Sequence, residues 1–389
     1  MTEFHDAPRL PRGFACASRN CGIKASGNDL SLFVSETEAA SAAIFTRNHF
    51  PGAPIVLGRE TIRGGVLRAV VVNSRVSNVG TGAAGVAAAR RMAAAAAAEI
   101  GCDPGHVLVS STGVIGVPLP IEKIEAGLRG MAAELQSDPL PGARGIMTTD
   151  TVPKALSLSV GAATITAVAK GAGMVAPNMA TMLAYLFTDA RLDAATLDRL
   201  LRSCADDTFN MLSIDSDTST SDTCAILANG LAGPVDEAGF ADALRTLCTR
   251  TTELLARDGE GATKLLRATV RGAASAQDAR MVARSIVESP LIKTMARGAD
   301  PNVGRILMAI GKCFAARVEP ARTSAWINGA AVIADGMRVD FDEPALRTSL
   351  AGDPVELEVD LGVGVHQSRA WGCDLTEGYV QENAAYYSS

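Results

Sequence analysis

One threonine in this sequence stands where a reactive hydroxyl could be generated. Residues 170–190 read KGAGMVAPNMATMLAYLFTDA, so Thr181 lies between a loop that contains glycine and proline and a strongly apolar run. A hydroxyl nucleophile needs a base, and one economical base is the α-amino group of the same threonine, which must then begin a chain. An internal threonine reaches that state when the peptide bond before it is cut.

The residues around Thr181 suit self-cleavage by an N→O acyl shift. The Thr181 hydroxyl would attack the carbonyl of Ala180, whose small side chain leaves that carbonyl approachable, and water would hydrolyse the resulting ester. Gly171, Gly173 and Pro177 would supply tight turns that hold the bond in a reactive geometry.

The released amine is suited to act as a base, although a simpler interpretation of Thr181 also exists. An α-amino group has a pKa of about 8, and burial near a cation such as Lys170 would lower that pKa and favour the neutral base. A capping or buried threonine at the start of a strand or helix has the same local pattern. From spacing alone both interpretations stay open.

Composition indicates a chain with a substantial aliphatic core. Of its 389 residues 48% are hydrophobic and only 4% aromatic, which favours one large or two moderate domains. The net charge of -6 excludes the basic footprint typical of nucleic-acid or anionic-membrane binding. Because the start lacks a signal pattern and no run of about 18 apolar residues occurs, we expect a cytoplasmic protein without a membrane span.

Metals and nucleotides are not expected as ligands. The eight cysteines and four histidines are dispersed, which favours buried reduced thiols over a metal site or disulfide framework. No glycine-rich segment has G-x-G-x-x-G spacing between a strand and a helix. Residues 213–223 have the acid spacing of a calcium loop but lack its central glycine, so we expect a polar turn there.

Apolar periodicity predicts a chain that mixes strands and helices. Strands are predicted at 30–36, 41–48, 53–60, 67–74, 106–116, 155–171, 325–333, 355–364 and 368–375. Helices are predicted at 84–100, 121–135, 192–212, 237–259 and 278–298. Runs of strands followed by runs of helices favour an α/β fold with largely antiparallel sheets over a doubly wound sheet.

Several long motifs along the chain can be compared with those of known families. They are the segment around Thr181, SSTGVIG at 110–116, IMTTDTVPK at 146–154, DGEGATK at 258–264, SPLIKT with DPNVGR within 289–305, and WGCDLTEGYVQEN at 371–383. In this order they resemble the ornithine acetyltransferase family, the arginine-pathway glutamate N-acetyltransferases that cleave themselves before this threonine. The resemblance covers nearly the whole chain.

The resemblance implies roles for individual residues. Thr181 matches the nucleophile, which carries the acyl group as an ester and begins the second chain after cleavage between Ala180 and Thr181. Thr112 and Gly113 match a pair whose hydroxyl and backbone N–H stabilise a tetrahedral oxyanion. Glu260 matches a catalytic acidic residue of the pocket, suited to bind an α-amino group or to position the base. The matched substrate-binding residues are Thr151, Lys170, Asn383 and Ser388.

The resemblance also implies a fold and an assembly. The fold is of the N-terminal-nucleophile type, with two sandwich-like α/β domains of mainly antiparallel sheets flanked by helices. The larger domain, 1–275, would contain the cleavage site, and the smaller domain would be 276–389. Cleavage would produce an α chain, 1–180, and a β chain, 181–389, assembled as α2β2. Because the chain itself carries the acyl group, no cofactor or metal is implied.

The implied reaction is ping-pong transfer of an acetyl group from N2-acetylornithine, or a similar N-acetyl amino acid, to glutamate. Two alternatives stay open: a self-processed amidohydrolase or aminopeptidase in which water takes the acyl group, and an uncleaved homologue without activity. The residues Arg75-Val76-Ser77-Asn78 replace a Gly-Asn-Ala-Asn turn common in the family, and Val303 replaces a common tryptophan. These changes leave donor and acceptor preference open, including a role in a secondary-metabolite pathway.

Overall fold

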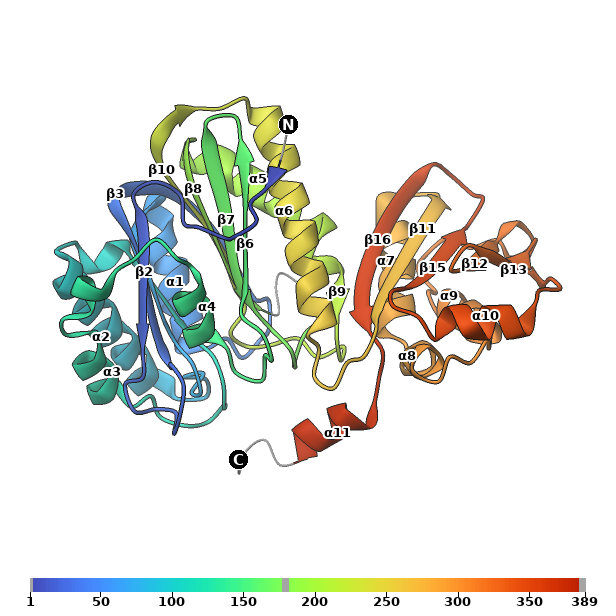
Figure 1. Cartoon of the computed structure of the whole chain (residues 1–389), viewed down its shortest axis with the longest axis horizontal. Coiled ribbons are helices and arrows are strands. Elements are labelled where there is room, and N and C mark those ends of the chain that lie inside the picture. The colour runs from blue at the N-terminus through green and yellow to red at the C-terminus, as the bar shows by residue number, and fades with distance from the viewer. Residues whose placement is uncertain (1–2, 177–181, 385–389) are drawn as a thin grey trace. The chain divides into compact units, whose positions relative to one another are not determined.

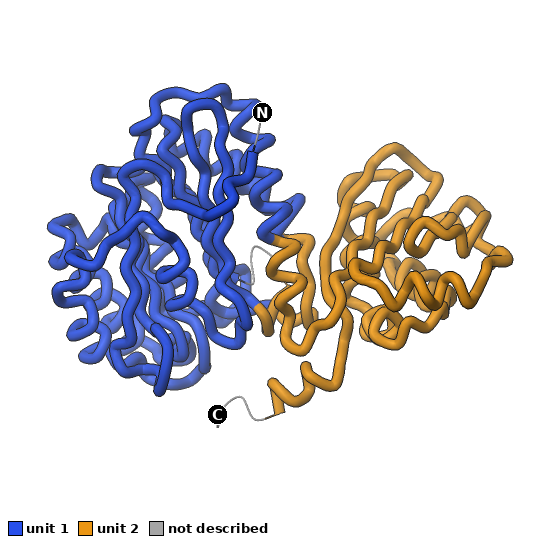
Figure 2. Tube along the Cα trace, in the orientation of Figure 1, with its two compact units in different colours: residues 1–171, 177–209, 218–251 blue, residues 172–176, 210–217, 252–389 orange. Residues whose placement is uncertain are grey.

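The computed structural model describes residues 3–176 and 182–384 and divides into two compact units (Figure 1) (Figure 2). Unit 1 comprises Met1–Gly171, Pro177–Phe209 and Thr218–Thr251. Unit 2 comprises Ala172–Ala176, Asn210–Asp217 and Thr252–Ser389. The sequence-based division into domains 1–275 and 276–389 stays a prediction.

Within the described residues, unit 1 is built on a nine-stranded sheet with the order β1-β6-β7-β8-β10-β3-β4-β5, and β2 pairs with β3 beside this path. The strands are β1 (Glu3–Phe4), β2 (Phe14–Arg19), β3 (Leu30–Phe45), β4 (Val66–Asn73), β5 (Val107–Ser111), β6 (Lys154–Val160), β7 (Ala163–Lys170), β8 (Leu183–Arg191) and β10 (Thr223–Pro234).

Helices cover both faces of this sheet. They are α1 (Ala53–Thr61), α2 (Gly82–Ile100), α3 (Ile121–Leu128), α4 (Leu140–Ile146), α5 (Ala194–Asp207) and α6 (Glu237–Arg257), whose last turns belong to unit 2. Short 3₁₀ turns lie at Ile62–Gly64, Pro104–His106, Met131–Glu134 and Phe209–Met211.

Alternate residues of the central strands enter two separate cores. In β3, Leu32 and Val34 belong to the core beneath α2 and α3, whereas Phe33 between them belongs to the opposite core, which includes residues of α4. Successive side chains of a strand point to opposite faces, so a sheet that is covered on both sides needs apolar residues at consecutive positions. This explains the continuous apolar runs in the sequence.

Unit 2 holds a seven-stranded sheet, counted over the described residues, with the order β14-β13-β12-β15-β11-β16-β9. The strands are β9 (Leu212–Ser213), β11 (Leu265–Ala273), β12 (Ser324–Ile327), β13 (Ala330–Ala334), β14 (Met337–Arg338), β15 (Val355–Asp360) and β16 (His366–Cys373). The helices are α7 (Ala276–Glu288), α8 (Pro290–Arg297), α9 (Gly304–Gly311), α10 (Glu343–Leu350) and α11 (Glu377–Ala384), and a 3₁₀ turn lies at Pro320–Arg322.

The predicted α/β class is confirmed in its general form. Among the described strands, the pairs β4–β5, β8–β10, β11–β15 and β16–β9 are parallel and the other named pairs are antiparallel. The predicted helix at 84–100 corresponds to α2. The predicted strands at 30–36 and 41–48 are two parts of the single strand β3.

The prediction of a strand at 53–60 is wrong, because Ala53–Thr61 form the helix α1. Pro54 lies in the first turn of this helix, where its missing N–H costs no helical hydrogen bond. Gly58 packs on the Phe45 ring, where a β-carbon would come within 2.9 Å of a ring atom. A short apolar run does not by itself distinguish a buried strand from a buried helix.

The eight cysteines are free thiols, with Cys21 and Cys102 half-buried and the others buried. Residues 3–176 and 182–384 contain no group of three or more His, Cys, Asp or Glu side chains that could hold a metal ion. None of the helices in these ranges has the length and apolar character needed to cross a membrane.

Candidate active site

The residues that flank the predicted cleavage site end and begin neighbouring strands of unit 1. Lys170, the last residue of β7, pairs with Leu183, the first of β8, and Leu183 pairs with Thr223, the first of β10. These three residues therefore form one row at one end of the sheet. The predicted cleavage-site residues Ala180 and Thr181 lie outside the described residues.

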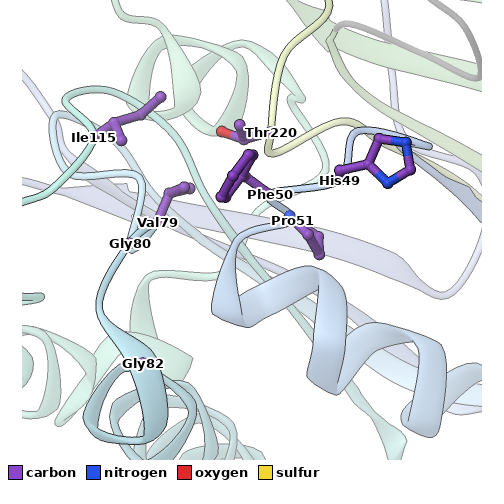
Figure 3. Close-up of a pocket in the computed structure, with 8 residues that line it drawn as sticks. All are labelled: His49, Phe50, Pro51, Val79, Gly80, Gly82, Ile115 and Thr220. Atoms are coloured by element: carbon purple, nitrogen blue, oxygen red, sulfur yellow. The ribbon is translucent and has the colours of Figure 1, made fainter.

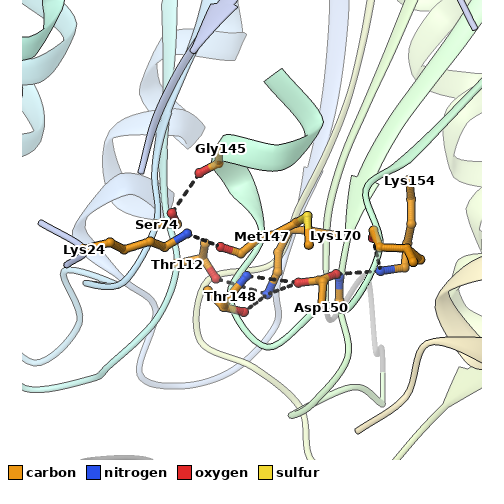
Figure 4. A network of polar contacts seen from close by, with 11 residues as sticks. Lys24, Ser74, Thr112, Gly145, Met147, Thr148, Asp150, Lys154 and Lys170 are labelled. Carbon is orange, nitrogen blue, oxygen red and sulfur yellow. Dashed lines mark hydrogen bonds and ion pairs between the residues drawn. The ribbon is translucent and has the colours of Figure 1, made fainter. Parts of the chain in front are cut away.

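Lys170 lies in a buried polar cluster (Figure 4). Its Nζ donates to Thr148 Oγ1 at 2.7 Å and to Thr112 Oγ1 at 3.5 Å, and it lies 3.8 Å from Asp150 Oδ2. Burying a cation is costly unless it is paired and hydrogen-bonded, and these contacts offset that cost. The structure thus brings two predicted site residues, Lys170 and Thr112, into one cluster.

Asp150 anchors this cluster from a fully buried position. Its Oδ1 accepts hydrogen bonds at 2.7 Å from Lys154 Nζ and from the Gly171 N–H, and its Oδ2 accepts the Thr148 N–H at 3.1 Å. Burial by itself would raise the pKa of Asp150, but the Lys170 and Lys154 cations hold that pKa well below its usual range. The ionised Asp150 carboxylate therefore holds the Lys170 ammonium group and the backbone N–H of Gly171, the first residue after β7.

Asp150→Asn is expected to lower the stability of the fold. The substitution removes the charge that compensates two buried lysines, and breaking a buried ion pair typically costs about 3–5 kcal/mol. Because the folded state depresses the pKa of Asp150, this stabilisation is present above the ordinary aspartate pKa and is lost as the pH falls through the depressed value. Thermal unfolding from neutral to acid pH checks this, and an unchanged midpoint at neutral pH would contradict it.

The predicted oxyanion pair follows β5 and packs on a neighbouring loop. The Thr112 N–H donates to Asn73 O at 3.0 Å, and the Val114 N–H donates to Arg75 O at 2.9 Å. Gly113 has φ +124°, and a β-carbon there would lie 2.2–2.6 Å from backbone atoms of Arg75. Only glycine permits this close approach, so the loop that contains Arg75 determines where the Gly113 backbone lies.

The segment Arg75-Val76-Ser77-Asn78 has a left-handed backbone at its first and last residues. Arg75 has φ +81° and Asn78 has φ +54°. This region is common for asparagine and unfavourable for arginine. Ser77 donates its N–H and its hydroxyl to Val114 O, at 3.0 and 2.8 Å. These hydrogen bonds link residues 75–78 to the segment 112–116.

From the predicted role of Gly113 as an oxyanion donor, we expect Gly113→Ala to reduce the predicted acetyl transfer by about 100- to 1,000-fold, the usual cost of losing one such donor. The added methyl group collides with the Arg75 backbone and must displace the Gly113 N–H. Gly116→Ala is the matched control, because Gly116 also has a positive φ, +82°, but no atom lies within 4 Å of the added carbon. Steady-state transfer rates check this, and equal losses in both variants would attribute the effect to loop strain.

Two predicted pocket residues of unit 2 are in contact. Glu260 is 9% exposed, its N–H donates to Ala172 O at 2.9 Å, and its Oε2 accepts Asn383 Nδ2 from α11 at 2.6 Å. A β-carbon on Gly173 would lie 2.2 Å from Glu260 Oε1, so glycine is required for the carboxylate to approach this backbone. The other predicted C-terminal residue, Ser388, lies outside the described residues.

Another carboxylate of unit 2, Asp215, binds the backbone of the segment Ala172–Ala176. It accepts the N–H groups of Met174 at 2.5 Å and Val175 at 2.8 Å, and it accepts the Tyr379 hydroxyl at 3.5 Å. Ile214 N–H donates to Val175 O at 2.6 Å, and Met174 has φ +55°. The backbone directly before residue 177 is therefore held in a conformation that a non-glycine residue rarely adopts.

A pocket of about 390 Å³ opens elsewhere in unit 1 (Figure 3). Its lining residues are His49, Phe50, Pro51, Val79, Gly80, Gly82, Ile115 and Thr220. The Phe50 side chain is 78% exposed. The Gly116 N–H donates to Val79 O at 2.9 Å, so a lining residue of the pocket is hydrogen-bonded to the segment 112–116. No predicted site residue lines this pocket.

The sequence analysis did not identify three charged residues, Asp150, Lys154 and Asp215, that bond to the predicted site residues or to the backbone beside them. Asp150 and Lys154 stand four residues apart within the 146–154 motif, and their opposite charges at that spacing were the available signal. Asp215 lies in the polar segment 213–223, which connects β9 to β10. Thr151 is exposed, and its role in substrate binding stays a prediction. The hydroxyl that contacts Lys170 is that of Thr148.

Comparison with known proteins gives consistent matches over nearly the whole chain. The model of the ArgJ family matches residues 15–388. The chain is 44% identical over 379 residues to the arginine biosynthesis bifunctional protein ArgJ of Rhodococcoides fascians, covering 97% of this chain and 94% of that relative. It is 43% identical over 388 residues to the glutamate N-acetyltransferase Oat2 of Streptomyces clavuligerus, covering 97% and 98%.

A solved structure agrees with these matches. The crystal structure of the ArgJ protein from Bacillus halodurans has 40% identity and a TM-score of 0.51, covering 53% of this chain and 100% of that chain. Fold and sequence together define an α/β enzyme of the acetyltransferase class. The chain belongs to the ArgJ family. This confirms the predicted resemblance and the predicted enzyme class, an acetyltransferase of arginine biosynthesis.

Proposed function

We propose that this protein is a glutamate N-acetyltransferase that takes its acetyl group from N2-acetylornithine or a similar N-acetyl amino acid. Family membership supports the class of reaction, because curated relatives include a glutamate N-acetyltransferase at 43% identity. The structural observation that carries the proposal is the 3.5 Å contact between Lys170 Nζ and Thr112 Oγ1. It puts a cation suited to a substrate carboxylate beside the predicted oxyanion donor.

Self-cleavage would prepare the nucleophile. The Thr181 hydroxyl attacks the Ala180 carbonyl, and the peptide C–N bond breaks to release the α-amino group of Thr181. Water then hydrolyses the ester to the Ala180 carboxylate and the free Thr181 hydroxyl. The length of a solved relative supports this proposal. The Bacillus halodurans chain is matched in full by 53% of this chain, a share close to that of residues 181–389.

Acetyl transfer would then proceed in two half-reactions. The α-amine of Thr181 takes the proton of its own hydroxyl, which attacks the acetyl carbonyl of the donor. The Thr112 hydroxyl and the Gly113 N–H stabilise the oxyanion, and the donor amino acid leaves with the proton. The amine of glutamate takes the acetyl group from the threonine ester by the same steps in reverse.

The remaining predicted residues would bind substrate. Lys170 and Thr151 are proposed to bind the donor and acceptor in turn, with the Lys170 cation pairing with a carboxylate. Glu260 is proposed to position the substrate amine or the base, and its contact with Asn383 supports a shared role for these two residues. Ser388 is proposed as a further contact.

We further propose the assembly that the resemblance implies. The α chain, 1–180, and the β chain, 181–389, would stay together as one folded body of the N-terminal-nucleophile type and pair into an α2β2 assembly. The two units of the structure, each a sheet with helices, are compatible with two sandwich-like domains. A cytoplasmic location remains a prediction from the sequence.

Intact mass of the denatured purified protein, followed by an acetyl-transfer assay, tests the proposal. Two fragments that meet between Ala180 and Thr181, together with acetylglutamate formed from N2-acetylornithine and glutamate, are the expected results. Deacetylation at the same rate with and without glutamate would identify a hydrolase. A single full-length species without activity would identify an uncleaved homologue.

A further inference from the structure

A second lysine, to which the proposed reaction gives no role, reaches the cluster that contains Lys170 (Figure 4). Lys24 Nζ donates to Met147 O at 2.8 Å and to Asn28 O at 3.0 Å. Met147 directly precedes Thr148, whose hydroxyl accepts Lys170 Nζ at 2.7 Å. The ammonium groups of the two lysines therefore bond to adjacent residues of the chain.

Lys24 is a half-buried cation without a carboxylate partner. Among the described residues, no carboxylate lies within ion-pair distance of its Nζ. An ammonium group has three N–H donors, and the two backbone carbonyls accept two of them. One donor and the whole positive charge are left for another acceptor, and burying a charge is least costly when an opposite charge pairs with it.

The backbone of Lys24 is held in place by a fully buried acid, Asp29. Asp29 Oδ1 accepts the Cys21 N–H at 2.7 Å. Asp29 Oδ2 accepts the N–H groups of Ile23 and Lys24, at 2.7 and 2.8 Å. Both carboxylate oxygens thus bind the backbone of the loop 20–24, so Asp29 fixes the start of the Lys24 side chain and leaves its ammonium group unpaired.

The side chains of the cluster carry more positive than negative charge. Lys24, Lys154 and Lys170 are cations, whereas Asp150, which contacts Lys154 and Lys170, is the carboxylate that faces them. One carboxylate cannot neutralise all of these lysines. The excess of positive charge beside Thr148 favours a ligand that brings negative charge of its own.

We propose that Lys24 and Lys170 form a binding site for a dicarboxylate, in which each lysine pairs with one carboxylate. This inference rests on the proposed function, which assigns a substrate carboxylate to Lys170, and deepens it. Because neighbouring Cα atoms lie only about 3.8 Å apart, two ammonium groups bonded to residues 147 and 148 are within reach of one small molecule.

The site distinguishes the acceptor of the proposed reaction from its donor. Glutamate has two carboxylates, one for each lysine. N2-acetylornithine has one carboxylate, and its side chain ends in an amine that is a cation at neutral pH. Lys24 attracts the second carboxylate of glutamate and repels the terminal cation of the donor, so it determines specificity for the acceptor.

Lys24→Gln removes the charge and keeps a group that donates to backbone carbonyls. We expect the KM for glutamate to rise by about 10-fold or more, the usual scale for loss of a hydrogen bond between charged groups. The KM for N2-acetylornithine is expected to stay the same or fall, and kcat to change little. Initial rates with each substrate varied in turn check this, and Lys24→Arg, which keeps the charge, is expected to restore most of the affinity for glutamate.

Lys123→Gln is the matched control, because exposed Lys123 bonds to the same loop through Gly22 O at 2.6 Å. We expect it to keep both wild-type KM values. If Lys24→Gln raises both KM values equally and lowers the unfolding midpoint, Lys24 only holds the loops together and the proposal is wrong. An unchanged KM for glutamate in Lys24→Gln would also overturn it.

Equilibrium binding tests the site without any acetyl transfer. Glutarate and pentanoate have the same number of carbon atoms, but glutarate has two carboxylates and pentanoate has one. Titration calorimetry of the purified full chain is expected to show glutarate bound at least about 10-fold more tightly than pentanoate, and Lys24→Gln to remove this difference. Equal affinities in the wild type, or no binding of glutarate, would overturn the proposal.

The two measurements separate this inference from the proposed function. Selective glutarate binding by a wild-type chain that transfers no acetyl group would remove the proposed function and leave the dicarboxylate site. Acetyl transfer to glutamate with no effect of Lys24→Gln on the KM or on glutarate binding would remove the dicarboxylate site alone.

Discussion

Thr181→Ala is expected to abolish both self-cleavage and acetyl transfer, because the same oxygen atom attacks in each reaction. The variant should remain a single full-length species by intact mass. Its transfer rate should fall by at least about 10⁴-fold, since loss of a nucleophile leaves only binding and oxyanion stabilisation. This is the largest effect expected for a single substitution in the chain.

Two companion variants make this result specific. Thr181→Ser keeps an attacking oxygen and is expected to retain part of both activities. Thr188→Ala removes a buried hydroxyl of β8, which donates to Thr164 O at 2.8 Å, and is expected to cost stability without stopping cleavage. Fully processed Thr181→Ala protein would show that the Thr181 hydroxyl does not drive cleavage.

Glu260→Gln is expected to impair acetyl transfer far more than self-cleavage. The substitution keeps the size of the side chain and an oxygen that can accept Asn383 Nδ2, but it removes the negative charge that would hold an amine or orient the base. A loss of about 100-fold or more in kcat/KM is the usual scale for such a group. Cleavage is measured by intact mass and transfer by acetylglutamate formation, both on the same sample.

The control for this prediction is Glu377→Gln, because Glu377 begins α11 and pairs with Arg297 on the exposed surface. We expect that variant to match the wild type in both assays. Equal loss of cleavage and transfer in Glu260→Gln would indicate that Glu260 holds the fold of its unit. In that case its contacts with the backbone of Ala172 and with Asn383 would be structural.

Much of the regular structure could be predicted because its signals are local. The Ala-rich helix α2 and the strand structure at 155–171, which forms β6 and β7, follow from periodicity within a single segment. The helix α1 could not be predicted in this way, because its short apolar run is compatible with a strand. Two features suit the helix: Pro54 lies in its first turn, and Gly58 packs against the Phe45 ring of β3.

The predicted site residues were found through motifs, and the structure adds the groups that hold them. Lys170 and Thr112 were named from separate motifs, and the fold brings them into one cluster although four strands lie between β7 and β5 in the sheet order. Asp150 was overlooked because an aspartate near a strand usually lies on a solvated surface. Its function as an anchor depends on burial with two lysines, which is a property of the packed sheet.

The sequence by itself determined the family, the class of reaction and the candidate nucleophile, because these depend on residue types at short spacings within continuous motifs. Only the tertiary structure decided which buried acid holds the predicted site residues. Asp150 precedes Lys170 by twenty residues in the chain, yet the fold places its carboxylate 3.8 Å from the Lys170 Nζ. The depressed pKa of Asp150 depends on the Lys170 and Lys154 cations, which are buried beside it only when distant strands pair and exclude water.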